Sequence, residues 1–238
     1  MERGLGGEIA VSVETFLRQR AVNIAVNGSY SLERRWYDSA GKLRSFACRT
    51  TRVSPFRMLV EVPIVGRVGE RVTSYFREFG EVEGVISEPM QGGFLVDMEM
   101  TPANRARLAE QLAWLERKLK DSSIQDARDD ARMIPPASHS VLILADGSVH
   151  GCFIIDISSA GAGISAEIQP PIGTPLAIGA CVGRVIRVFE TGFAVKFLER
   201  QDLDDLSRLI ILKPRPGSTS LAEERISRLV GQQSTKCA

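Results

Sequence analysis

An internal repeat constrains this chain more than any other feature of its sequence. The run ACRTTRVSPF around Cys48 matches GCFIIDISSA around Cys152 at an offset of 104 positions, which also aligns Ser54 with Ser158. Further along, GEVEGVISEPMQGGFLVDM resembles GACVGRVIRVFETGFAVKF at an offset of 99. Surface loops tolerate insertions better than strands do, so the small difference between the two offsets fits two copies of one fold.

Both copies have the pattern of short β-strands. Runs rich in Val, Ile, Leu and Phe are bounded by Gly, Pro and Asp, and Asp146-Gly147 between SVLIL and SVHGCFIIDI is a strong hairpin signal. Gly192 marks another tight return between strands. About six strands per copy suit a small antiparallel barrel, whose closure hides the sheet edges. We therefore expect a mainly β protein with flanking helices, made of two small antiparallel β-barrels joined by an amphipathic helix.

Helical signals follow each copy. TPANRARLAEQLAWLERKLK begins with Thr101 as N-cap and Pro102 at the first helical position. Its leucines share one helical face: Leu108, Leu112, Leu115 and Leu119. DLDDLSRLIIL predicts a corresponding helix after the second copy. A capping box from Ser220 to Glu223 then predicts a short amphipathic helix suited to docking a partner.

Composition excludes several classes of protein. A chain of 238 residues with 44% apolar residues has room for two ordinary domains, each with its own core. The net charge of +1 gives no overall field for a long nucleic acid, so an anionic ligand must be met by a local cluster of charges. The first twenty residues contain no sustained apolar run, and no stretch of the chain is apolar over the length of a membrane span, so we expect neither a signal peptide nor a transmembrane segment. Four scattered cysteines without Cys-x-x-Cys spacing suit reduced thiols, and we expect a cytoplasmic protein.

Two short motifs stand in the second copy. Arg128 and Arg132 form an RxxxR pattern before its first strand, and Asp156, Ser158 and Gly161 form a DxSxxG pattern at the end of its second strand. Together, and in this order, they resemble the PilZ domain family, in which the two motifs bind the bacterial second messenger cyclic di-GMP. The resemblance covers roughly residues 127–212 and implies a PilZ-like barrel of the split-barrel type.

The resemblance also implies a role for each motif residue. Cyclic di-GMP is compact and doubly anionic, and it carries two guanines. Arg128 and Arg132 would fork onto phosphate oxygens or guanine O6 and N7, or stack on a base. Asp156 would accept from the guanine N1 and N2 donors, and Ser158 would donate to a phosphate or to the turn backbone. Gly161 would permit a positive φ and a close approach of the ligand.

Other interpretations of these residues remain open. Arg128 and Arg132 could pair with neighbouring aspartates on a solvated linker, where ion pairs contribute little to stability. Asp156 alone could be a structural Asx-turn residue. Arg184 and Arg187 could extend the basic surface, but strand alternation places them on opposite or uncertain faces, so we leave them outside the site.

The first copy departs from the motif. Its acidic position holds Arg52 and its glycine position holds Arg57, so that only the serine remains, as Ser54. Residues near Val22 and Val26 stand where the arginine pair would fall. We therefore expect a degenerate PilZ-like barrel that serves as a scaffold or interaction surface.

These expectations give a complete organisation of the chain. The degenerate barrel spans residues 1–100, an amphipathic helix and linker 101–126, the PilZ domain 127–212, and a tail with a short helix 213–238. The resemblance implies a receptor, with cyclic di-GMP as ligand and no cofactor or metal. Binding would rearrange the domains and control motility, exopolysaccharide or biofilm formation through an unidentified protein partner.

The sequence leaves two alternatives to this function. An enzyme is disfavoured because His139 and His150, the only histidines, stand near no evident nucleophile or metal-ligand set, and the chain has no phosphate-binding glycine loop. A PilZ-like interaction module that does not respond to nucleotide is the other alternative.

Overall fold

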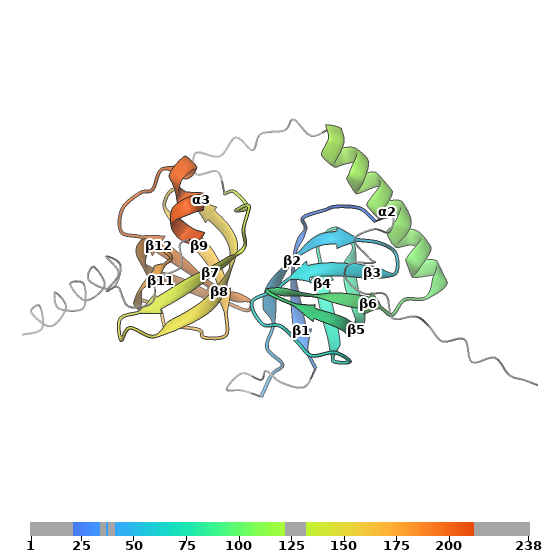
Figure 1. The fold of residues 1–238 in the computed structure, drawn as a ribbon, viewed down its shortest axis with the longest axis horizontal. Helices are drawn as coiled ribbons and strands as arrows, with labels where there is room; N and C mark the ends of the chain where they lie inside the picture. The colour runs from blue at the N-terminus through green and yellow to red at the C-terminus, as the bar shows by residue number, and fades with distance from the viewer. Residues whose placement is uncertain (1–20, 34–36, 38–40, 122–131, 212–238) are drawn as a thin grey trace, which may run out of the picture.

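The computed structural model describes residues 21–33, 37, 41–121 and 132–211. These residues form two closed antiparallel barrels that lie side by side, each accompanied by a helix (Figure 1). The expected fold class, mainly β with two small barrels and flanking helices, is confirmed.

The first barrel follows the strand order β1-β2-β3-β6-β5-β4. Its strands are β1 (Asn27–Leu32), β2 (Phe46–Val53), β3 (Arg57–Glu61), β4 (Arg71–Phe76), β5 (Gly80–Met90) and β6 (Gly93–Met98). Alternate side chains fill the interior, and four aromatic rings dominate that core: Tyr30, Phe46, Phe76 and Phe94.

The second barrel repeats this topology, with the order β7-β8-β9-β12-β11-β10 around the barrel. Its strands are β7 (His139–Leu144), β8 (Val149–Ser158), β9 (Gly161–Ala166), β10 (Pro175–Ile178), β11 (Cys181–Phe189) and β12 (Gly192–Phe197). A separate core, made mainly of aliphatic side chains with Phe193 and Phe197, fills this barrel. Each copy of the repeat therefore has its own hydrophobic core.

The β-bulges confirm the register of the repeat. In the second barrel β8 has an irregularity between Ile154 and Asp156, and β2 of the first barrel has one between Thr50 and Arg52, which is the offset of 104. The pairs β5–β6 and β11–β12 also carry matching irregularities, at the offset of 99. Since a bulge re-aims the side chains beside it, its retention keeps the same face of each copy turned outward.

The two glycine signals have different physical reasons. Gly147 adopts a φ of +83° in the turn between β7 and β8, where the Asp146 carboxylate accepts from the Ser148 amide at 2.9 Å. Gly192 begins β12 without a positive φ, and a Cβ there would overlap the carbonyl oxygen of Ile164. Gly192 is therefore required by close strand packing, and Gly147 by turn conformation.

In Figure 1, α2 lies along the side of the first barrel away from the second, and α3 lies at the top of the second barrel. α2 (Pro102–Asp121) has the expected N-cap, since the Thr101 hydroxyl accepts from the Asn104 amide at 3.3 Å. Its buried leucines join the first core: Leu108, Leu112 and Leu115. The side chain of Leu119 and the expected helix at Ser220–Glu223 lie outside the described part. α3 (Leu203–Ile211) buries Leu206 and Ile210 in the second core. Neither described helix is long and apolar enough to cross a membrane.

Candidate functional site

A cavity of about 480 Å³ lies on the outer face of the second barrel. Residues of β8, β9, β11 and β12 line it, and Gly28 of β1 and Ala47 of β2 add a contribution from the first barrel. Its charged lining residues are Arg132, Asp156, Arg187 and Lys196. The cavity is within the size range of small-molecule sites and has an excess of positive charge.

Strand pairing sets the shape of this cavity. Asp156 of β8 pairs with Gly163 of β9, Gly163 pairs with Ala194 of β12, and Ala194 pairs with Arg187 of β11. Directly paired residues of a sheet point to the same face, so Asp156 and Arg187 stand at the two ends of one row. The small residues between them leave the floor of the cavity open.

The bulge in β8 presents Asp156 to the cavity. Ile157, the next residue, is fully buried in the barrel, whereas the Asp156 side chain is 27% exposed. A Cβ on Gly163 would lie 3.1 Å from Asp156 Oδ1, so this glycine leaves the carboxylate its space. Gly163 is a site residue that the sequence reasoning missed.

The segment before β7 runs along β8. Met133 and Ile157 exchange backbone hydrogen bonds of 2.8 and 2.9 Å. This pairing brings Arg132 to the cavity, where its Nη1 lies 3.2 Å from Asp156 Oδ2. The structure therefore brings together one residue from each predicted motif. Arg128 lies outside the described residues.

Ser158 and Gly161 close the turn between β8 and β9. The Ser158 hydroxyl donates to the carbonyl of Gly161 at 3.4 Å, which matches its expected contact with the turn backbone. The expectation of a positive φ at Gly161 was wrong. A Cβ on Gly161 would overlap the carbonyl oxygen of Val195, so close approach of β12 is what requires glycine here.

The structure gives the faces of the two β11 arginines, which the sequence left opposite or uncertain. Arg184 and Arg187 are three residues apart and would face opposite ways on a regular strand, but the bulge at Ile186 turns both outward. Arg187 lines the cavity, whereas Arg184 donates to the carbonyl of Gly173 at 3.1 Å. The same bulge occurs in β5 of the first barrel. In β11 it sets the direction of Arg187, but a bulge cannot be recognised from the sequence alone.

In the first barrel, larger side chains fill the region that corresponds to the cavity floor. The row that matches the cavity floor consists of Arg52, Leu59, Leu95 and Glu88. Leu59 and Leu95 are buried and pack with Ala21, which stands where Arg132 stands in the second barrel. Because two leucines replace Gly163 and Ala194, the floor is occupied by the chain itself.

The bridge pairs correct the alignment of the arginine positions. Val22 bridges Val53, and Met133 bridges Ile157, which matches Val53 at the offset of 104. Ala21, rather than Val26, therefore corresponds to Arg132. The expected correspondence with Val26 was wrong because the connection between the first and second strands is longer in the first barrel than in the second.

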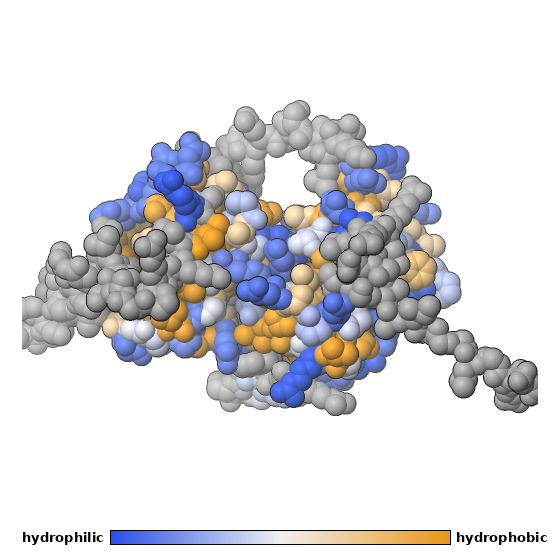
Figure 2. All heavy atoms as spheres, in the orientation of Figure 1, coloured by the Kyte–Doolittle hydropathy of each residue, from blue (hydrophilic) through white to orange (hydrophobic). Residues whose placement is uncertain are grey.

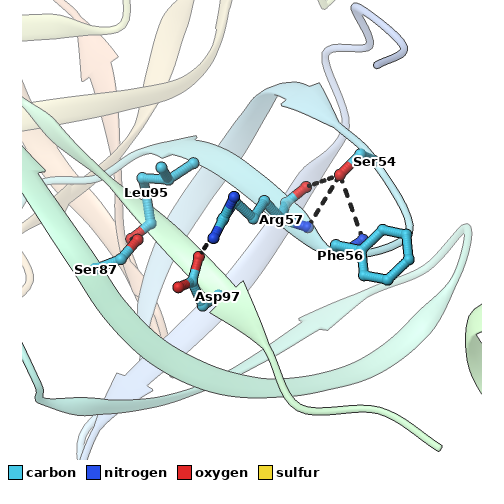
Figure 3. Close-up of polar contacts among 6 residues, drawn as sticks. All are labelled: Ser54, Phe56, Arg57, Ser87, Leu95 and Asp97. Carbon is cyan, nitrogen blue, oxygen red and sulfur yellow. Dashed lines mark hydrogen bonds and ion pairs between the residues drawn. The ribbon is translucent and has the colours of Figure 1, made fainter. Parts of the chain in front are cut away.

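An ion pair occupies the glycine position of the first barrel (Figure 3). Arg57 Nε on β3 lies 2.5 Å from Asp97 Oδ1 on β6, and Asp97 corresponds to Lys196. Ser54 keeps the turn role of Ser158, since its hydroxyl donates to the carbonyl of Arg57 at 3.2 Å and also accepts from the amides of Phe56 and Arg57. The motif serine is thus structural in the first barrel.

A buried arginine of β2 connects the first barrel to the motif strand. Arg49 is 3% exposed and donates to the carbonyls of Ile154 at 3.2 Å and Ile155 at 2.8 Å. It also donates to the Ser138 hydroxyl, which donates to Glu61 Oε2 at 2.7 Å. Burial lowers the pKa of Arg49, and the nearby carboxylates of Glu61 and Asp156 oppose that shift. Hydrophilic residues gather where the barrels meet in Figure 2.

Within the described ranges, no group of histidine, cysteine, aspartate or glutamate side chains could hold a metal ion. Three cysteine thiols in this part are free and buried: Cys48, Cys152 and Cys181. Burial raises the pKa of Cys152 to about 12 and that of Cys181 to about 11. These thiols are therefore packing groups rather than reactive ones.

Residues 126–212 match the family model described as PilZ domain, which coincides with the second barrel and its cavity. No curated protein matches the chain. Among solved structures, the Borreliella burgdorferi PlzA protein in complex with c-di-GMP is 11% identical, covering 79% of this chain and 86% of that chain, with a TM-score of 0.25.

Two further structures are similar at the same level. YcgR from Escherichia coli in complex with c-di-GMP is 12% identical, covering 90% of this chain and 85% of that chain, with a TM-score of 0.23. The Bacillus subtilis inhibitor of motility MotI/DgrA is 12% identical, covering 90% of this chain and 99% of that chain, with a TM-score of 0.25. Identities and TM-scores at this level support no conclusion about function, whereas the family match covers the second barrel.

Proposed function

Since residues 126–212 form a PilZ domain, we propose that the chain is a non-enzymatic receptor for cyclic di-GMP, which binds in the cavity of the second barrel. The observation that carries this proposal is the meeting of Arg132 and Asp156, one from each motif, at the edge of a cavity floored by glycine and alanine. In this proposal residues 1–100 and 127–212 are separate domains.

Each motif residue has a role that suits this ligand. Arg132, with Arg128, forks onto phosphate oxygens or a guanine edge, which a planar guanidinium does better than a lysine ammonium. Asp156 accepts from the guanine N1 and N2 donors. Ser158 and Gly161 shape the turn and the close strand approach beside the ligand.

The ion pair between Arg132 and Asp156 gives way at little cost. Its side chains are 62% and 27% exposed, and exposed ion pairs contribute about 0.2–1 kcal/mol. Ligand contacts to both groups would replace it. The pair therefore keeps two binding groups together until the ligand arrives.

Binding would also affect the contact between the barrels. Gly28 and Ala47 of the first barrel line the cavity, so a ligand there touches both barrels. A ligand that favours one arrangement of the barrels over another shifts the population toward it. We propose that this rearrangement is read by a protein partner that controls motility, exopolysaccharide or biofilm formation.

Isothermal titration calorimetry with cyclic di-GMP tests the receptor assignment. The wild-type chain should bind at micromolar concentration or tighter, and Arg132→Ala and Asp156→Ala should bind at least tenfold more weakly, as expected when a charge-assisted hydrogen bond is lost. Arg52→Ala is the matched control, because Arg52 holds the Asp156 position in the first barrel. A wild-type chain that gives no binding heat would favour the nucleotide-independent interaction module.

A further inference from the structure

Two cations line the cavity that belong to neither motif. Arg187 on β11 ends the row that begins with Asp156, and Lys196 on β12 pairs directly with Gly161. Both side chains are exposed, and no ion pair is found for either of them among the described residues. The cavity therefore has charges on the side of the floor away from Arg132.

The width of the floor separates these cations from the motif residues. Adjacent strands lie about 4.8 Å apart, so the backbone of Arg187 stands roughly 14 Å from that of Asp156, across β9 and β12. Gly163 and Ala194 fill the row between them, and their small side chains leave the path open. The two sides of the floor are thus placed to contact different parts of one ligand.

The side chain of Arg187 is steadied by an aromatic ring. Its guanidinium carbon lies 5.7 Å from the centroid of the Phe189 ring, within the range of a cation–π contact. Phe189 also lines the cavity. A planar guanidinium held this way keeps its edge free to fork onto an anionic group.

The first barrel shows that the fold itself does not require cations here. Glu88 corresponds to Arg187 and Asp97 to Lys196, so both charges are reversed. Asp97 is neutralised by Arg57, which occupies the glycine position. The same topology thus accepts a positive or a negative charge at these two positions. Folding therefore does not explain why the second barrel has cations there.

We infer that Arg187 and Lys196 form a second cationic wall that binds the ligand's second phosphate group, on the side of the cavity floor away from Arg132. The inference rests on the proposed function, since it assigns additional contacts to the same ligand. A cyclic dinucleotide carries two phosphodiester groups, and the motif arginines on one side leave the other group for this wall. Arg187 and Lys196 then act as affinity-determining residues outside the family motifs.

Calorimetry of the full chain with cyclic di-GMP tests the wall. Arg187→Gln and Lys196→Gln should each weaken binding about tenfold, because each removes one charge-assisted contact. Arg208→Gln is the control, since it removes the same charge from α3 at a position that does not line the cavity. The wild-type affinity should also fall with added salt more steeply than that of the double variant Arg187→Gln/Lys196→Gln.

The outcomes separate this inference from the proposed function. If the wild-type chain binds, Arg132→Ala loses binding and both wall variants bind within twofold of wild type, the wall is overturned and the receptor stands. If the wild-type chain does not bind, the receptor assignment itself fails. A loss of affinity, or of bound equivalents per chain, in the wall variants but not in Arg208→Gln supports the wall. Because both residues are exposed, unchanged thermal unfolding of the variants should exclude misfolding as the cause.

Discussion

The guanidinium of Arg49 donates to the backbone carbonyl of Ile155 at 2.8 Å, so that a side chain of the first barrel holds the residue directly before Asp156. Ile155 is the bulged residue of β8. A contact at this point couples the packing of the barrels to the direction in which the motif carboxylate points. The interface and the candidate site therefore share one structural element.

Loss of Arg49 should weaken the contact between the barrels. Arg49→Ala leaves the carbonyls of Ile154 and Ile155 without their donor in a buried setting, which costs about 3–5 kcal/mol when one partner of a buried charged network is removed. Urea unfolding should report this loss, and hydrogen exchange should become faster in β8. Cyclic di-GMP affinity should fall as well.

Arg52→Ala provides the comparison on the same strand. Arg52 is half-buried and donates to Asn23 at 3.0 Å in an exposed contact, so its loss should cost about 1 kcal/mol or less. Equal effects of the two substitutions on unfolding and on β8 exchange would contradict the coupling.

The glycine of the second motif should tolerate no side chain. Gly161→Ala places a Cβ against the carbonyl of Val195, which should cost about 1–3 kcal/mol through displacement of β12 and should weaken ligand binding. Gly151→Ala is the matched control on β8, since a Cβ there meets nothing within 4 Å. Thermal unfolding should show a loss for the first variant only. A Gly161→Ala protein as stable as wild type would disprove the close-packing explanation.

The barrels could be predicted from the sequence because their signals are local or repeated. Hairpin residues such as Asp146-Gly147, and the N-cap at Thr101, act through their own backbone conformation. The repeat strengthened the prediction, because a strand pattern found in one copy was also found at the matching positions of the other. These signals do not depend on which residues meet across the molecule.

The rest of the site depends on contacts between strands, which a single sequence does not specify. The bulge at Ile186 places Arg187 in the cavity, and strand alternation alone left its face uncertain. The same limit applies to Gly163. Its lack of a side chain matters only because the Asp156 carboxylate lies next to it on the neighbouring strand. Arg49 was missed because its contacts with Ile154, Ile155 and Ser138 cross between the two copies of the repeat, about 100 residues away in the chain.

The helix α2 should stabilise the first barrel through its buried leucines. Leu112 is 2% exposed and packs in the first core, so Leu112→Ala should cost about 2–5 kcal/mol in urea unfolding. Trp114 lies on the other side of the helix and is 53% exposed, so Trp114→Ala should cost less than about 1 kcal/mol. A larger loss for Trp114→Ala would mean that α2 packs through its other face.

The buried thiol of Cys152 should make stability fall in alkali. Burial raises its pKa to about 12, whereas an exposed thiol in the unfolded chain ionises near 8.5. Above that pH the unfolded state loses a proton that the folded state keeps, so the free energy of unfolding falls by about 1.4 kcal/mol per pH unit until the folded thiol also ionises. The stabilisation that the protonated Cys152 thiol gives to the folded state is fully present below about pH 8.5. It is lost as the pH rises from there to about 12.

Cys152→Ala isolates this effect from other titrations. The variant lacks the thiol but keeps every lysine and tyrosine, so the difference between its unfolding free energy and that of wild type should shrink or reverse from pH 8 to pH 10.5, by about 2 kcal/mol. Urea unfolding at four or five pH values across that range measures the difference. Parallel pH profiles for the two proteins would mean that Cys152 has the same pKa in the folded and unfolded states. That result would contradict the burial of Cys152 in the second core.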